Sequence, residues 1–283
     1  MQAAASFLHN PHLANFLTGR IYRGPTKAAC VPGLNCYSCP GAAGACPIGS
    51  LQSFLSGVSP RFPAYVLGAI LLMGLTFGRF ICGWLCPFGF VQELFYRLPG
   101  KKLGKSPLTQ RLSRLKYVWS VFFVLVLPLI FWGMTGVGIP AFCKFICPAG
   151  TLEGAVPLLS TNTMLRSAAG AITVWKFALL AVFLGLMIIT YRPFCRWFCP
   201  LGAAYGCCNR QALLGVAVDP QRCIHCGRCA KVCGMDTTIA GDRECISCGD
   251  CLKHCPTKAI YFRQPLKTAI FSQKSSAEET SGK

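Results

Sequence analysis

Three long apolar stretches dominate the pattern of hydrophobic and polar positions. They cover about residues 64–82, 117–134 and 172–190. Each approaches the roughly 20 apolar residues that a helix needs to cross a bilayer. The pattern therefore predicts three membrane-spanning helices, with a kink in the second, because Pro128 interrupts its hydrogen bonds.

The chain also repeats a short motif, Cys-Pro-x-Gly, which begins at Cys46, Cys86, Cys147 and Cys199. Each half of the chain has one such motif, then a span, then a second motif. In the second half another span precedes the first motif, so the weakly apolar residues 2–19 should be a short span by analogy. The sequence thus predicts an α-helical membrane protein with about four transmembrane helices as two parallel pseudo-repeats.

Composition and charge support a membrane location. Hydrophobic residues make up 53% of the 283 residues and charged residues only 13%, against about 25% in soluble domains. The net charge is +19, and the basic residues flank apolar spans and cysteine motifs. This pattern favours anionic lipid and acidic protein partners over nucleic acid.

The basic segment 97–116 contains no acidic residue, which predicts a cytoplasmic loop by the positive-inside rule. The part of the chain after the last span then also lies in the cytoplasm. The predicted location is the cell (inner) membrane, with several crossings. The predicted organisation is a first membrane half-repeat (1–100), a basic loop (101–116), a second half-repeat (117–218), a small α+β two-cluster domain (219–262) and a polar tail (263–283).

Twenty cysteines carry the candidate chemistry. Two runs of C-x2-C-x2-C-x3-C follow the last span, which is the bacterial ferredoxin spacing for two [4Fe–4S] clusters. A pair of zinc sites is the alternative. Because the fourth cysteine of each run serves the other cluster, the predicted ligand sets are Cys223, Cys226, Cys229 and Cys255, and Cys245, Cys248, Cys251 and Cys233.

The cysteines of the membrane region fall into an inner and an outer set. The predicted topology places Cys82, Cys86, Cys195 and Cys199 near the cytoplasmic face, where they would hold a further iron–sulfur cluster; unligated buried thiols are the alternative. For the outer face, matching onto Cys143 and Cys147 suggests Cys39 and Cys46, with Cys36 as the rival and a disulfide as the alternative. One or two further clusters are expected. Cys30, Cys207 and Cys208 have no predicted role.

The residues around these cysteines suit an anionic cluster. Proline after cysteine can begin a helix, whose N-terminal amides would then point at the sulfur atoms. Arg79 and Arg192 each lie three residues before an inner cysteine pair. They are either cluster-binding residues or anchors for lipid headgroups. Glu93 and Glu153 are the only carboxylates before residue 219 and could serve proton transfer or lie at the surface.

These motifs resemble a known family. CGWLCPFG, CKFICPAG and CRWFCPLG, followed by the double ferredoxin run, resemble the NapH/NosR type of polyferredoxin-like membrane proteins over about residues 60–262. The stretch NCYSCPGAAGACPIG resembles a subgroup from anaerobic bacteria. The resemblance implies four or more membrane helices, a cytoplasmic two-cluster domain, and electron transfer between a quinol or ferredoxin pool and a partner oxidoreductase.

The sequence therefore predicts an iron–sulfur protein that carries electrons from an acidic cytoplasmic carrier, of the ferredoxin or flavodoxin type, to an acceptor at or across the membrane. A hydrocarbon core of about 30 Å is a long gap for a direct electron hop between clusters at its two surfaces. Two alternatives stay open: a quinone-linked subunit of an oxidoreductase, and a metal-reducing or maturation factor. No catalytic residues are predicted, and an electron carrier cannot be told from an oxidoreductase subunit.

Overall fold

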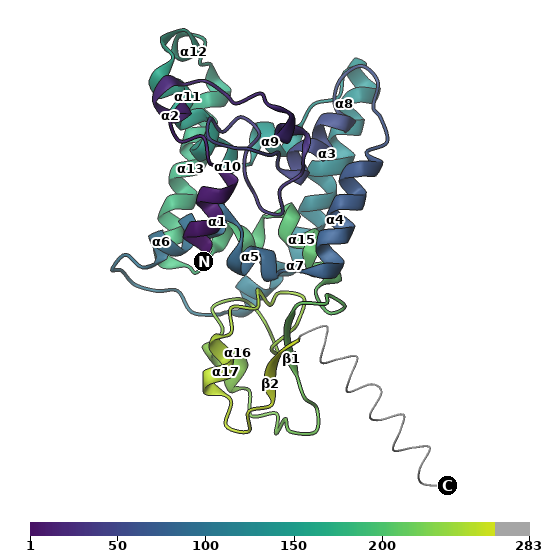
Figure 1. Ribbon diagram of the computed structural model, residues 1–283, viewed down its shortest axis with the longest axis vertical. Coiled ribbons are helices and arrows are strands. Elements are labelled where there is room, and N and C mark those ends of the chain that lie inside the picture. The colour runs from purple at the N-terminus through teal and green to yellow at the C-terminus, as the bar shows by residue number, and fades with distance from the viewer. Residues whose placement is uncertain (264–283) are drawn as a thin grey trace.

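The computed structural model describes residues 1–263 and is mostly helical, with a single two-stranded sheet in that range. Two columns of helices form the larger part, and a small part with the sheet lies at one end of them (Figure 1). The polar tail predicted at 263–283 lies, from residue 264 onward, outside the described residues.

Short helices around a few long ones make up the helical part. In chain order its elements are α1 (Gln2–His9), α2 (Asn15–Thr18), the 3-10 helix η1 (Pro25–Ala28), α3 (Pro47–Leu55), α4 (Ala64–Thr76), α5 (Phe80–Trp84), α6 (Pro87–Tyr96), α7 (Pro107–Val121), the π-helix η2 (Phe122–Val126), α8 (Leu127–Thr135), α9 (Ala141–Phe145), α10 (Pro148–Gly150), the π-helix η3 (Thr151–Ala155), α11 (Val156–Thr161), α12 (Thr163–Ser167), α13 (Ala171–Ile189), α14 (Pro193–Trp197) and α15 (Pro200–Cys208). The small part contains β1 (Gly215–Val218), α16 (Arg228–Val232), α17 (Asp250–His254) and β2 (Ile260–Arg263).

Two helical stretches among the described residues are long and apolar enough to cross a membrane. The first, Pro107–Thr135, joins α7, η2 and α8, and the second is α13. At a rise of 1.5 Å per residue they are about 43 Å and about 28 Å long. The apolar helix α4 has only 13 residues. These helices indicate a membrane protein, but they are fewer than the four crossings predicted.

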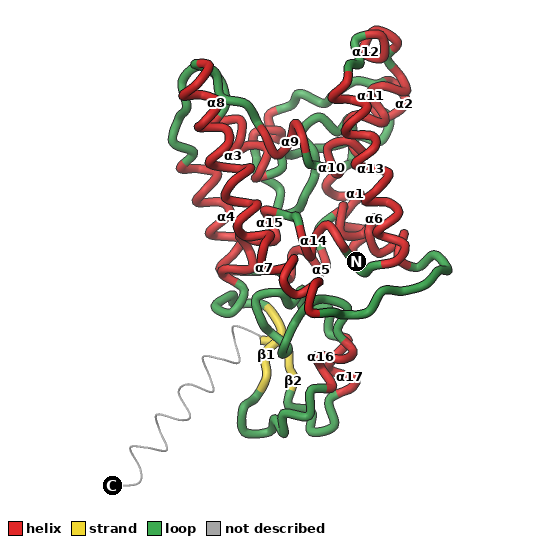
Figure 2. The backbone as a smooth tube through the Cα atoms, turned by 180° about the vertical axis from the view of Figure 1, so that it is seen from behind, coloured by secondary structure: helices red, strands yellow, loops and turns green. Residues whose placement is uncertain are grey.

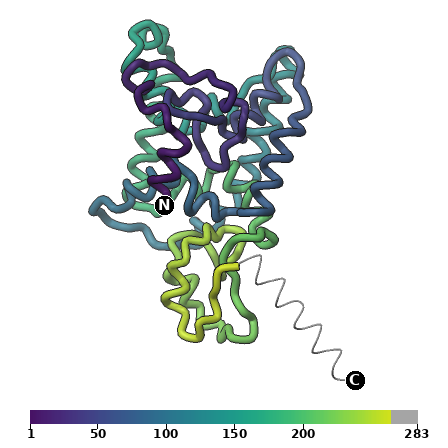
Figure 3. Tube along the Cα trace, in the orientation of Figure 1, coloured from purple at the N-terminus to yellow at the C-terminus, as the bar shows by residue number. Residues whose placement is uncertain are grey.

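Residues 2–19 do not form the single helix that the repeat suggested. Helix α1 ends at His9 and the four-residue α2 begins at Asn15. Pro11 explains the break, because proline has no N–H to donate and disfavours helical backbone at the residue before it. Figure 3 shows this N-terminal segment, in purple, continuing from one helical column to the other near the end opposite the sheet.

The long helix Pro107–Thr135 starts earlier and bends differently than predicted. Ser106 and Thr109 form a capping box, so the second half of the predicted basic loop is helical. The kink expected at Pro128 takes the form of the π-helical turn η2, where the Phe123 carbonyl accepts a hydrogen bond from Gln52 Nε2 at 2.9 Å. A side chain from α3 thus satisfies a carbonyl in the turn before this proline.

The small part is built on β1 and β2, which pair antiparallel from Gly215 opposite Arg263 to Val218 opposite Ile260 (Figure 2). A buried ion pair joins this part to the helices: Arg196 donates to both carboxylate oxygens of Asp236, at 2.6 and 2.9 Å. Thr109 Oγ1 donates to the same carboxylate at 3.0 Å. These contacts fix the small part against α7 and α14.

We expect Asp236→Ala to lower the free energy of unfolding by about 3–5 kcal/mol, because it leaves the buried Arg196 without its partner. Denaturant unfolding of the purified protein in detergent measures this loss. Arg222→Ala is the matched control, since the Arg222–Asp219 pair is exposed, at 3.6 Å, and should cost less than about 1 kcal/mol. Equal losses in the two variants would contradict the docking role of Asp236.

Candidate metal centres

The ferredoxin runs form one small cavity with the predicted crossed set of ligands. A cavity of about 110 Å³ lies in the sheet-containing part, on the side away from the larger helical part. It is lined by Cys223, Cys226, Cys229 and Cys255. Cys255 lies just beyond α17, so the second run completes the site of the first. We call this the distal site.

The other four ferredoxin cysteines lie next to the helical part and form the proximal site. Cys251 interacts electrostatically with Cys245, Cys248 and Cys233, and the last two pack against the core of the helical part. The loop after Cys245 rests on α5, where Trp84 Nε1 donates to the Ser247 carbonyl at 3.0 Å. The proximal site therefore lies between the distal site and the helices.

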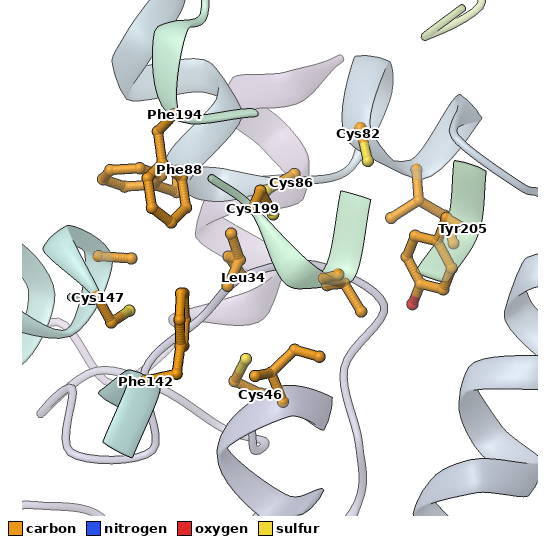
Figure 4. Packing of buried hydrophobic residues seen from close by; sticks show 14 of the residues in the cluster. Leu34, Cys46, Cys82, Cys86, Phe88, Phe142, Cys147, Phe194, Cys199 and Tyr205 are labelled. Atoms are coloured by element: carbon orange, nitrogen blue, oxygen red, sulfur yellow. The ribbon is translucent and has the colours of Figure 1, made fainter. Parts of the chain in front are cut away.

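The inner site brings together the four cysteines that the paired motifs predicted. Cys82 and Cys195 lie on α5 and α14, whereas Cys86 and Cys199 immediately precede α6 and α15. All four are buried, and each lies within electrostatic range of the others. Figure 4 shows Cys86 and Cys199 close together.

Helix starts point at the thiols, as the proline spacing predicted. In all four motifs the proline is the first residue of a helix and the cysteine precedes it. The Gly202 amide donates to Cys199 Sγ at 3.3 Å, and the Gly150 amide donates to Cys147 Sγ at the same distance. Such amide bonds stabilise a thiolate and an anionic cluster.

Each of the two arginines donates a hydrogen bond to a cysteine carbonyl in the opposite half of the pseudo-repeat. Arg79 precedes the first inner pair, but its Nη2 donates to the carbonyl of Cys195 in the second pair, at 3.3 Å. Arg192 precedes the second pair and donates to the carbonyl of Cys82 in the first. Both side chains are fully buried, so they lie beside the inner site and are not headgroup anchors.

The carboxylate partners of these arginines come from different elements. Arg192 pairs with Glu93 at 2.8 Å. Arg79 and the buried Lys116 both pair with Glu244, which immediately precedes Cys245 of the proximal site. Burial opposes ionisation of Glu244, but Arg79 and Lys116 outweigh it and lower the pKa of this carboxyl to about 2. Two cationic side chains therefore share one carboxylate beside the inner site.

The glycines of the motifs leave room for the same groups. A Cβ placed on Gly89 would lie 3.0 Å from the Cys82 carbonyl oxygen and 3.2 Å from Arg192 Nη1. On Gly202 it would lie 3.6 Å from both the Cys195 carbonyl oxygen and Arg79 Nη2. A side chain at Gly89 would therefore crowd the contact between Arg192 and the Cys82 carbonyl, whereas a Cβ on Gly202 would make only ordinary van der Waals contacts.

The outer site differs from the prediction in one cysteine. Cys36, Cys46, Cys143 and Cys147 line a cavity of about 1210 Å³, together with Cys30. Cys39, which we had expected as a ligand, does not line it, and its thiol donates instead to Asn10 Oδ1 at 3.4 Å. A Cβ on Gly150 would lie 3.5 Å from Cys36 Sγ and 3.8 Å from Cys147 Sγ, so these two thiols face the same glycine.

A second contact supports Cys36, and the sequence analysis missed its signal. The side chain six residues after three of the Cys-Pro cysteines accepts the amide of the first cysteine in the opposing pair. Gln52 accepts from Cys143 at 3.0 Å, Gln92 accepts from Cys195 at 3.5 Å, and Glu153 accepts from Cys36 at 2.8 Å. Cys36 therefore occupies the position that Cys143 and Cys195 occupy elsewhere.

The four sites fit clusters better than single ions or disulfides. All twenty cysteines lie within the described residues and are free. In the same residues no three Cys, His, Asp or Glu side chains converge closely enough to hold one metal ion. Grouped thiols with amide donors and buried cations around them suit the wider, anionic body of an iron–sulfur cluster.

Comparison with known proteins finds iron–sulfur domains over much of the chain. Residues 60–106, 118–159 and 173–216 match one 4Fe-4S binding domain, and residues 216–236 and 242–261 match two others. The chain is 29% identical to an uncharacterized protein of Methanocaldococcus jannaschii, over 78% of this chain and 87% of that protein. No solved structure matches the chain.

Two named relatives are longer than the region they share with this chain. The ferredoxin-type protein NapH of Escherichia coli is 29% identical over 66% of this chain, which spans 59% of NapH. The regulatory protein NosR of Pseudomonas aeruginosa is 28% identical over 58% of this chain, which spans 21% of NosR. The N-terminal residues 1–59, which carry Cys36 and Cys46, lie outside the three domain matches.

We expect Cys36→Ser to lose about four irons per chain, one [4Fe–4S] cluster, because Cys36 is a ligand of the outer site. Cys39→Ser is the matched control and should keep its iron, since its thiol faces Asn10. Iron and acid-labile sulfide on anaerobically purified protein measure both. Loss of iron from Cys39→Ser alone would restore the original assignment.

Proposed function

The chain belongs to the NapH/NosR type of polyferredoxin-like proteins, and from this we propose that it conducts electrons through a membrane along four contiguous cysteine sites. A [4Fe–4S] cluster, when bound, supplies one-electron chemistry at each site. The cysteine sites that would hold these clusters lie in a fixed order along the molecule. That order, from distal to proximal to inner to outer, is the observation that carries the proposal.

The distal site is the entry for electrons. Cys226 and the neighbouring Ile224 are exposed there. Five basic side chains around the two runs are also exposed: Arg222, Arg228, Lys231, Lys253 and Lys258. An acidic carrier of the ferredoxin or flavodoxin type suits this surface, because complementary charge speeds and orients association.

Contacts between the proximal and inner sites favour passage between them. Glu244 precedes a proximal ligand and pairs with Arg79, which in turn contacts the backbone of the inner ligand Cys195. The Ile246 carbonyl packs against Gly83, the residue after Cys82. A short route through few atoms therefore leads from one site to the other.

The outer site is the exit. Its cavity of about 1210 Å³ far exceeds that of the distal site, so there is room for an acceptor beside a cluster. This size also exceeds typical pockets of about 300–1,000 Å³ for small organic ligands. A quinone-linked subunit is therefore the second candidate function, with the quinone in this cavity. Nothing specific in the structure favours a maturation factor.

The proposed topology puts the sheet-containing part in the cytoplasm, with several crossings. The basic residues Lys101, Lys102 and Lys105 lie in the connection before α7, on the side of the ferredoxin-like part. Lys105 Nζ donates to the Ala230 carbonyl in that part. This placement follows the positive-inside rule. The inner contacts that cross between halves support the two parallel pseudo-repeats.

We expect wild-type protein to contain about sixteen irons per chain and Cys86→Ala/Cys199→Ala about four fewer, as four [4Fe–4S] clusters require. In liposomes without quinone, externally added dithionite should reduce an enclosed cytochrome c when the wild-type protein is present and should not do so in protein-free liposomes. Cys36→Ser should abolish this transfer, whereas Cys39→Ser should retain it.

Other results would support the second candidate function or contradict the conduit. Transfer that appears only after quinone is added to the lipid would support the quinone-linked subunit. Wild-type protein with about eight irons would confine clusters to the ferredoxin runs. A full iron content without transfer under either condition would overturn the conduit.

A further inference from the structure

The N-terminal segment Gly33–Cys36 reaches the inner site at its first residues. A Cβ on Gly33 would lie 3.0 Å from the Cα of Cys86 and 3.1 Å from Cδ of Pro87. Its own backbone therefore rests directly on the motif that supplies an inner ligand. The backbone of the next residue, Leu34, lies beside the Cys86 thiol.

The same segment reaches the outer site at its last residues. The backbone of Asn35 lies beside the Cys46 thiol, and Cys36 is itself one of the outer cysteines that line the cavity. Leu34 and Asn35 are fully buried. In Figure 4, Leu34 lies between the pair Cys86 and Cys199 on one side and Cys46 on the other. Two consecutive backbone groups thus contact one ligand from each site.

This four-residue segment limits how far apart the inner and outer sites can lie. Consecutive Cα atoms are 3.8 Å apart, so Gly33 and Cys36 are separated by at most about 11 Å. Gly33 already touches Cys86, and the hydrocarbon core is about 30 Å thick. The inner and outer sites therefore lie well inside the thickness of a membrane, which removes the long gap expected for clusters at its two surfaces.

We propose that Gly33–Cys36 is the electron bridge between the inner and outer sites, with Gly33 as the residue that positions it. This rests on the proposed function. With clusters bound at both sites, one electron would pass along this segment, so that the inner cluster would be oxidised and the outer cluster reduced, with no bond broken. The segment lies outside the matched 4Fe-4S binding domains, so the bridge belongs to the N-terminal region of this chain.

Gly33→Ala tests the bridge, because its methyl group would lie 3.0 Å from the Cα of Cys86, so that the segment or Cys86 must shift by a few tenths of an ångström. Gly68→Ala is the matched control, since a Cβ there has no neighbour within 4 Å. We expect Gly33→Ala to keep about sixteen irons but to weaken the magnetic coupling between inner and outer clusters in EPR spectra of the reduced protein. Freeze-quench EPR should also show severalfold slower appearance of the reduced outer cluster.

If Gly33→Ala does not assemble its clusters, the EPR spectrum of the reduced wild-type protein tests the bridge instead. It should contain a coupling that disappears in Cys36→Ser, where the outer cluster is missing. Absence of that coupling in wild-type protein with about sixteen irons would overturn the bridge and leave the conduit standing. Unchanged coupling and rate in a fully loaded Gly33→Ala would also overturn it. Fewer irons in the wild type would contradict the proposed function instead.

Discussion

Buried positive charge is the constraint on which this structure depends. A cluster held by four thiolates is an anion, and an anion inside a helical bundle is unstable unless cations or amides face it. Arg79, Arg192 and Lys116 supply that charge in side chains that are fully buried. Within residues 1–263, only two carboxylates, Glu93 and Glu244, contact these three cations. The imbalance makes the inner site a place for negative charge.

Contacts between the two halves hold the cysteine pairs together. Each arginine contacts the backbone of the opposing pair, and Gln52, Gln92 and Glu153 each hold a cysteine amide from the other half. Because every such contact joins segments far apart in sequence, the inner and outer sites form only when both halves pack. The same contacts link the sites to the ferredoxin-like part, where Glu244 is shared.

The sequence allowed the ferredoxin sets and the inner cysteines to be predicted, because their spacing is short and repeated. It placed Cys36 only as the rival of Cys39, because spacing alone could not choose between these two cysteines as the partner of Cys46. The position of Glu153, six residues after Cys147, was the available signal. The predicted N-terminal span was wrong because Pro11 breaks the helix, and the analogy between the two halves could not show this local break. The roles of Lys116 and Glu244 depend on tertiary contacts, which no local pattern encodes.

Ligands drawn from distant segments also constrain how the protein is made. A site has all its ligands only after its last cysteine has been synthesised. That cysteine is Cys147 for the outer site, Cys199 for the inner site, Cys251 for the proximal site and Cys255 for the distal site. During translation the sites are therefore completed in the order outer, inner, proximal and distal, which is opposite to the proposed electron flow. Iron–sulfur assembly machinery that loads the chain during synthesis would meet the outer and inner sites first. The nascent protein can thus be filled from its far end before the ferredoxin-like part covers the inner site.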